Sequence, residues 1–217
     1  MTWPHAEILL IAALSLRVAL LATLAACGLG IPVGVWFGMT TFAGRRGLLV
    51  LLNTALALPT VVVGLAIYLL LSRRGPLGDL GLLFTWQAIV AAEIVLAFPI
   101  AASLSAAAVQ AVDPRVRRTA LTLGAGPWRT ALAVAREARL AMAAAVAVAF
   151  GRVLSEVGAA LIVGGNIRGE TRTLTTAITL ATSQGDFTLA IALGLILLAL
   201  ALTVNAVLQL LQGRGDA

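Results

Sequence analysis

The segment RTALTLGAGPWRTALAVAREARLA, residues 118–141, is basic and is broken by glycine and proline, in a chain that is otherwise strongly apolar. It contains four arginines, and Arg117 directly precedes it, although only 11% of the chain is charged. Such a segment cannot cross a bilayer, because the hydrocarbon offers no water to charged side chains or to an interrupted helix backbone. It therefore predicts a loop at an aqueous surface, with apolar segments on both sides of it.

The rest of the chain has the composition of an integral membrane protein. Of its 217 residues, 61% are hydrophobic and the mean hydropathy is +1.05, far above the roughly 45–50% apolar content of soluble proteins. The net charge of +6 arises from 15 arginines and nine acidic residues, with no lysine. One histidine, His5, and one cysteine, Cys27, leave no histidine cluster for a metal and no disulfide framework. We therefore expect neither a metal site nor a bound cofactor.

The absence of lysine also limits nucleotide chemistry. A Walker A loop requires a lysine that holds the β- and γ-phosphates, so this chain cannot bind ATP in that way. The first residues lack the basic region of a signal peptide, and the apolar run continues to about residue 38, so we expect no cleaved signal.

Five segments are long and apolar enough to cross the roughly 30 Å hydrocarbon core, which requires about 20 residues of helix. They cover residues 12–39, 48–71, 86–110, 140–163 and 188–210. The sequence therefore predicts an all-α fold, a polytopic transmembrane helical bundle with five spans in a single domain over residues 1–217. Five spans place the two termini on opposite sides of the membrane.

The loop arginines predict which side is cytoplasmic. Nine of them share the side of the 111–139 loop: Arg45, Arg46, Arg115, Arg117, Arg118, Arg129, Arg136, Arg139 and Arg214. Four lie on the other side: Arg73, Arg74, Arg168 and Arg172. Because cytoplasmic loops carry the excess of basic residues, we expect the N-terminus outside and the C-terminus in the cytoplasm.

The loop over residues 111–139 has the pattern of a helix, a turn and a second helix. Asp113 and Pro114 are typical of an N-cap and a first helical position, which predicts a short helix over residues 115–123. Gly124 to Pro127 break this helix, and Trp128 begins the next one.

The short helix is predicted to be basic on one side and apolar on the other. Val116, Ala120 and Leu123 form the apolar side. A helix with such a face at a membrane surface needs a cover, either lipid headgroups or a groove on a partner protein. Composition alone leaves both covers open.

This segment resembles the coupling loop of ABC importer permeases, whose pattern is EAA, three residues, Gly, then nine residues and I-x-L-P. Aligned on Gly124, the EAA position holds Arg118, Thr119 and Ala120, the isoleucine position holds Val134, and Arg136-Glu137 replaces the LP pair. The run GRVLSEVGAALIVGGNIRGETRTLTTAI, residues 151–178, is similar to the tungstate-type branch of the molybdate, tungstate and sulfate permeases. The similarity extends over almost the whole chain, from LSLRVALLATLAACGLGIPVG in the first span onward.

The resemblance implies the type I ABC importer permease fold and a transport subunit that is not an enzyme. It implies that the chain moves an oxyanion, tungstate first and molybdate or sulfate as alternatives, into the cell by alternating access. Cytoplasmic ABC ATPase subunits would bind the ATP, an extracytoplasmic solute-binding protein would deliver the ion, and no nucleic acid is involved. The permease would be a homodimer in a bacterial or archaeal plasma membrane, because five spans are few for enclosing a pathway.

By the same resemblance, contacts with the ATPase fall in the coupling loop. The residues expected there are Val116, Arg118, Thr119, Ala120, Leu123, Gly124, Pro127 and Trp128. Two other classes of protein remain as alternatives. A passive channel would not need this long loop, and an intramembrane enzyme would need a catalytic constellation for which the spans offer few residues.

Ionisable residues inside the predicted spans are candidates for function. Arg152 and Glu156 are four residues apart on one helix face, so we expect them to pair, either as a structural clamp or as part of the pathway or gate. Arg17 lies near the outer end of the first span and can extend to the interface. Glu93, in the third span, can reach the outer interface or bond a neighbouring helix.

The outer side carries two further expected features. Arg168 and Arg172 lie at the expected outer mouth, where they would either raise the local anion concentration or contact an acidic surface on a docking protein. After Asn166, apolar residues such as Leu174 and Ala177 alternate with threonines at helical spacing, which predicts a short amphipathic helix. Pro59 should kink the second span.

Overall fold

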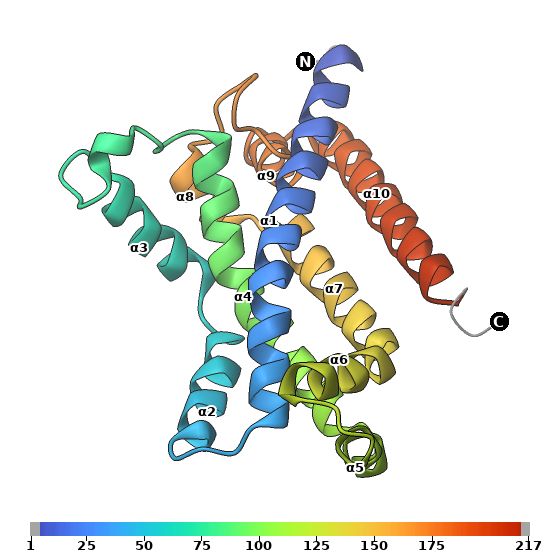
Figure 1. Cartoon of the computed structure of the whole chain (residues 1–217). Coiled ribbons are helices and arrows are strands. Elements are labelled where there is room, and N and C mark those ends of the chain that lie inside the picture. The colour runs from blue at the N-terminus through green and yellow to red at the C-terminus, as the bar shows by residue number, and fades with distance from the viewer. Residues whose placement is uncertain (1–4, 214–217) are drawn as a thin grey trace.

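The structure, a computed structural model, describes residues 5–213, and these residues are α-helical apart from turns and loops. The helices are α1 (His5–Met39), α2 (Arg45–Ala55), α3 (Thr60–Leu71), α4 (Trp86–Gln110), α5 (Pro114–Thr122), α6 (Pro127–Glu137), α7 (Arg139–Leu154), α8 (Gly158–Gly164), α9 (Leu174–Ser183) and α10 (Phe187–Gly213), with a 3-10 turn, η1, at Gly78–Leu80 (Figure 1). The predicted all-α fold is confirmed. Arg214, one of the arginines counted above, lies outside the described residues.

Three helices, α1, α4 and α10, are long and apolar enough to cross a membrane. Two helix pairs pass the same test together but are bent, α2 with α3 by 99° and α7 with α8 by 57°. By length and composition the described residues therefore hold three spans, or five where each bent pair counts as one. The predicted segment 86–110 coincides with α4, in which the Thr85 side chain caps the first turn by accepting from the backbone N–H of Ala88.

The predicted kink at Pro59 is confirmed by the break between α2 and α3, whereas the break inside the predicted segment 140–163 was not predicted. Between α2 and α3 the chain leaves helical geometry before Pro59, which lacks a backbone donor and disfavours helix in the residue before it. Between α7 and α8 no proline is present. There the break spans residues 155–157 and is stabilised by polar contacts of Glu156, described below.

α1 and α4 form the centre of the bundle and touch along a stripe of small residues. A Cβ added at Gly30 would lie 2.8 Å from Ala101 Cβ, and one added at Gly38 would lie 2.5 Å from Val109 Cγ1. Between them, a Cβ at Gly34 would collide with the backbone carbonyl of Ala102. Small residues at this spacing let two helix backbones approach closely, which drives helix association in lipid.

The two ends of the bundle differ in what they carry. The start of α1 lies at one end with α8 and α9, whereas α2, α5 and α6 lie at the opposite end (Figure 1). Near the α5 end, Trp36 stacks on Phe42 with ring centroids 5.1 Å apart. Towards the other end, the Arg17 guanidinium lies 4.0 Å from the centre of the Trp86 ring. Aromatic rings at both ends are typical of the two membrane–water interfaces.

Candidate functional site

The basic segment forms two helices, α5 and α6, joined by a tight turn. The Asp113 carboxylate caps α5 by accepting from the backbone N–H of Arg115 at 2.8 Å, and Pro114 takes the first helical position. The backbone N–H of Gly124 donates to Leu121 O at 3.0 Å, and that of Ala125 donates to Ala120 O at 3.0 Å. The predicted cap and short helix are confirmed. α6 begins at Pro127, one residue before the predicted Trp128.

Gly124 ends α5 in the left-handed region, with φ of 77°. Residues with a Cβ pay a steric penalty at positive φ, and glycine does not. The expectation that the chain leaves the short helix at Gly124 is therefore confirmed. The side chains of Leu123 and Trp128 lie on either side of this turn. The turn therefore sets the directions in which they project from the surface.

The apolar residues of this region are divided between interior and surface. Val116 packs against an interior cluster that includes Val134, Ala138 and Met142. Leu123 and Trp128 are instead 82% and 78% exposed. This corrects the prediction of one apolar face, because Val116 is turned inward while Leu123 is turned out.

The polar and small members of the predicted contact set also lie at this surface. Arg118, Thr119, Gly124 and Pro127 are exposed, and Ala120 is half-buried. Leu121, which the sequence analysis did not name, is 53% exposed. The exposure of Leu121 could have been predicted from the sequence. On a two-turn surface helix, Leu121 lies on a different face from Val116, so the two side chains cannot be buried on the same side.

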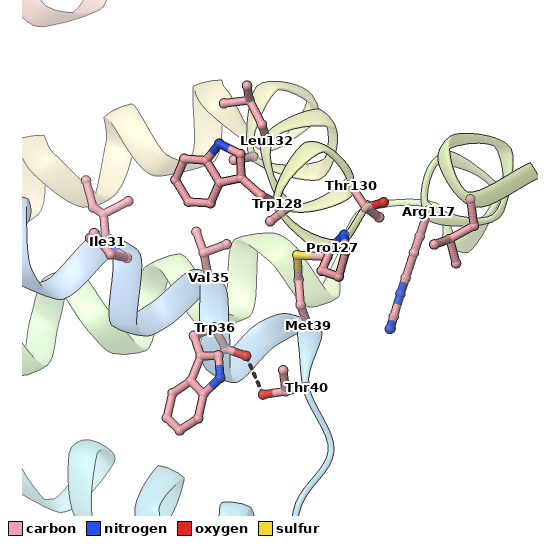
Figure 2. A pocket seen from close by; sticks show the side chains of 14 residues that line it. Ile31, Val35, Trp36, Met39, Thr40, Arg117, Pro127, Trp128, Thr130 and Leu132 are labelled. Atoms are coloured by element: carbon pink, nitrogen blue, oxygen red, sulfur yellow. Dashed lines mark hydrogen bonds between the residues drawn. The ribbon is translucent and has the colours of Figure 1, made fainter. Parts of the chain in front are cut away.

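A cavity of about 600 Å³ separates α5 and α6 from the end of α1. Figure 2 shows Val35, Trp36 and Met39 on its α1 wall and Trp128 on the other wall. Leu121 also lines this second wall. Most of its lining is apolar. The cavity lies between Trp128 and α1, so α5 and α6 pack less closely against α1 than α4 does.

Arg152 and Glu156 form the predicted pair, with 2.6 Å between Arg152 Nη1 and Glu156 Oε2. The helix that was predicted to carry both residues ends at Leu154, so Glu156 lies in the break. Its other oxygen, Oε1, accepts from the backbone N–H of Ala159 at 3.1 Å. Glu156 thereby ties α7 to the first turn of α8 across the 57° bend.

α9 contacts the same break. The Thr175 hydroxyl donates to the backbone carbonyl of Glu156 at 2.7 Å, and the backbone N–H of Leu174 donates to Ser15 Oγ of α1 at 2.7 Å. The predicted helix after Asn166 is confirmed as α9. Its threonines do not all face water, because Thr175 and Thr176 are buried. α9 therefore joins α1 to the break.

Removal of Arg152 should destabilise the fold more than removal of its partner Glu156. The Glu156 side chain is 3% exposed and that of Arg152 is 36% exposed. Arg152→Gln leaves a buried carboxylate and should lower the free energy of unfolding by about 2–3 kcal/mol, whereas Glu156→Gln leaves a partly hydrated guanidinium and should cost about half as much. Thermal unfolding of the two single variants and the double variant measures the coupling. Additive losses would show that the two side chains do not act as a pair.

Arg168 and Arg172 converge on the start of α1. Arg168 Nε and Nη2 donate to the two carboxylate oxygens of Glu7 at 2.7 and 2.5 Å, and this bond raises the pKa of Arg168. Arg172 Nη1 lies 3.7 Å from Glu7 Oε1, and Arg172 Nε donates to Asn166 Oδ1 at 3.2 Å. Burial lowers the pKa of Arg172, and the nearby Glu7 carboxylate counteracts only part of this shift. One carboxylate thus offsets part of the charge that was predicted for the outer mouth.

The fold and these sites define a class of protein. Within residues 5–213, no group of three or more His, Cys, Asp or Glu residues could hold a metal. The apolar helices, the broken spans with a buried charged pair and a two-helix basic loop at one end are features of the membrane subunit of a transporter.

The chain belongs to the family described as binding-protein-dependent transport system inner membrane component, whose profile matches residues 30–215. It is thus the permease component of a transport system in an inner membrane. As such, it is a transport subunit and not an enzyme.

Relatives with named functions match nearly the whole chain. A probable anion ABC transporter permease of Haloferax volcanii is 44% identical over 90% of this chain and 87% of its own length. A tungstate uptake system permease of Peptoclostridium acidaminophilum is 40% identical over 92% and 87%. A molybdenum transport system permease of Escherichia coli is 34% identical over 87% and 86%.

A solved structure agrees with the fold. One chain of the crystal structure of an amino acid ABC transporter with histidines matches with a TM-score of 0.71, over 99% of this chain and 100% of that chain. The two sequences are only 19% identical, so this likeness shows the fold alone. The predicted ABC importer permease fold is confirmed.

Proposed function

We propose that this chain is the permease subunit of an ATP-driven importer that moves tungstate into the cell by alternating access. The observation that carries the proposal is the 40% identity, over 92% of the chain, with a permease named for tungstate uptake. The anion permease at 44% identity supports the same class of cargo. Molybdate is the second candidate, because molybdenum permeases match at 34% identity.

ATP is bound by separate ATPase subunits that dock on α5 and α6. The exposed side chains of Leu121, Leu123 and Trp128 support this docking surface, since large apolar groups at an aqueous end require a partner. Arg118 and Thr119 lie beside them and are exposed. The family name, binding-protein-dependent, supports a separate extracytoplasmic protein that delivers the ion.

The permease acts as a homodimer of single-domain chains, each with five spans. α3 supports this arrangement, because Val61, Val62, Leu65 and Leu69 are 50–58% exposed and must face lipid or a second copy. α5 and α6 face the cytoplasm, which places the start of α1 outside and the end of α10 inside. The arginine bias of the loops supports this orientation.

Competition between oxyanions tests the cargo. The permease, its ATPase and its binding protein are reconstituted in vesicles, and ATP-driven uptake of labelled tungstate is measured against molybdate and sulfate. We expect tungstate to be taken up best and sulfate to be the weakest competitor. Stronger competition by sulfate or by an uncharged solute would contradict the tungstate proposal, and uptake without ATP would contradict the transporter class.

A further inference from the structure

Glu93 is a buried carboxyl group that neither the transport proposal nor the Arg152–Glu156 pair uses. It lies on α4, two turns and about 10 Å below Trp86 at the 1.5 Å rise of a helix. The residue is 2% exposed, and among the described residues its Oε2 atom has no hydrogen-bond partner. The outer interface and a bond to a neighbouring helix, the two outcomes expected from the sequence, are therefore both wrong for this oxygen.

Glu93 lines a small cavity together with polar residues from other elements. The polar lining residues are Ser15 of α1, Glu93 of α4, Glu156 of the break, and Thr173 and Thr175 at the start of α9. The cavity has a volume of about 10 Å³, which is the space of about one water molecule. Four parts of the chain thus meet around a space for a single small occupant.

The charges around the cavity do not balance. Glu156 is compensated by Arg152 and by the N–H of Ala159. α1 and α9 contribute only hydroxyl and apolar side chains to the cavity, so among the described residues that line it no second cation faces Glu93. Two carboxylates therefore share one guanidinium. A carboxylate buried without a partner is costly, and it takes up a proton instead.

We propose that Glu93 is a proton-binding site, neutral in this packed arrangement, with one water in the cavity between its carboxyl group and the threonine hydroxyls. Separation of α4 from α8 and α9 admits water, and the carboxyl group then releases its proton to solvent. Because alternating access requires such separation, proton binding is linked to the transport cycle. The link rests on the proposed function, whereas the proton site does not.

The proton is tested first by infrared spectroscopy of the full permease in lipid nanodiscs. We expect a carbonyl band of a buried protonated carboxylic acid that shifts slowly in D₂O. Glu93→Gln, which is nearly isosteric and always neutral, should lose the band and remain folded. Glu170→Gln removes an exposed carboxyl group and should keep it. Absence of the band from the wild type, or its loss only in Glu156→Gln, would overturn the proposal.

The pH dependence of stability gives an independent readout. The folded protein binds one proton that the unfolded chain has lost at neutral pH, so stability is greatest in acid and falls as pH rises. Above the pH at which a solvated carboxyl group loses its proton, the unfolding equilibrium constant of the wild type should rise by up to tenfold per pH unit relative to that of Glu93→Gln. Equal slopes would overturn the proposal. Stabilisation of the wild type alone by sodium at fixed pH would also overturn it, in favour of a bound cation.

ATP-driven uptake tests the link to transport. Wild-type uptake should decline at alkaline pH, where Glu93 rebinds its proton slowly, and uptake by Glu93→Gln should not. Identical pH profiles together with the infrared band would keep the proton site and remove its link to the cycle. Loss of ATP dependence in both proteins would instead count against the proposed function.

Discussion

Gly34→Leu should remove most of the folded permease, because α1 and α4 touch backbone to backbone at this residue. A Cβ there would collide with the Ala102 carbonyl and lie 2.7 Å from Ser105 Cβ and 3.0 Å from the Ala106 nitrogen. A backbone contact cannot be relieved by turning a side chain. Overpacking of this kind costs about 3 kcal/mol, a large part of the stability of a typical domain. The measurement is the amount of monodisperse protein after detergent extraction.

Gly28→Leu is the matched control for this prediction. Gly28 lies on the same helix, is exposed, and has no atom within 4 Å of an added Cβ. The two variants add the same apolar mass and gain the same helix propensity, so they differ only in contact with α4. We expect Gly28→Leu to give wild-type yield. Similar yields from both variants would mean that α1 and α4 are farther apart than described.

The sequence predicted the spans well where a span is one helix. Residues 86–110 and α4 coincide because a threonine cap and a polar loop both mark the start of the helix, and transmembrane helices tolerate an internal proline such as the buried Pro99. The break at residues 155–157 was not predicted, because its cause is tertiary. Glu156 accepts from Arg152 and Ala159, and α9 bonds its carbonyl, but these partners are brought together only by the fold.

The glycine stripe of α1 could have been found from the sequence. Gly30, Gly34 and Gly38 recur every four residues, which places them on one helix face. The sequence does not identify the partner helix, because apolar segments of similar composition offer many small residues. Only the structure shows that α4 presents Ala101 and Ala102 to this face.

The candidate sites divide in the same way. Gly124 was predictable because the requirement for positive φ is local. The inward direction of Val116 was not, because it depends on where α6 and α7 place Val134 and Met142. Glu93 was visible as a charge in a span, but the lack of a partner for its oxygen depends on every neighbour at once.

Gly124→Val should uncouple ATP hydrolysis from transport. At φ of 77° a β-branched residue is strongly disfavoured, and relief of a strain of at least about 1–2 kcal/mol would re-form the turn. The end of α5 then carries Leu123 away from its present direction, and the surface proposed to dock on the ATPase is lost. We expect transport per ATP hydrolysed to fall by roughly tenfold. The measurement compares uptake and ATPase rates in the same vesicles.

Gly126→Val separates the conformation of the turn from the mere addition of a side chain. Gly126 lies two residues away, is exposed and also has open space at its Cβ, but its φ of −67° and ψ of 171° suit valine. The proline that follows favours the same extended region. We therefore expect Gly126→Val to keep coupled transport, and Gly124→Ala to lie between the two valine variants because alanine lacks the β-branch. Full coupling in Gly124→Val would contradict the docking proposal, because the turn would then not set the direction of the contact surface.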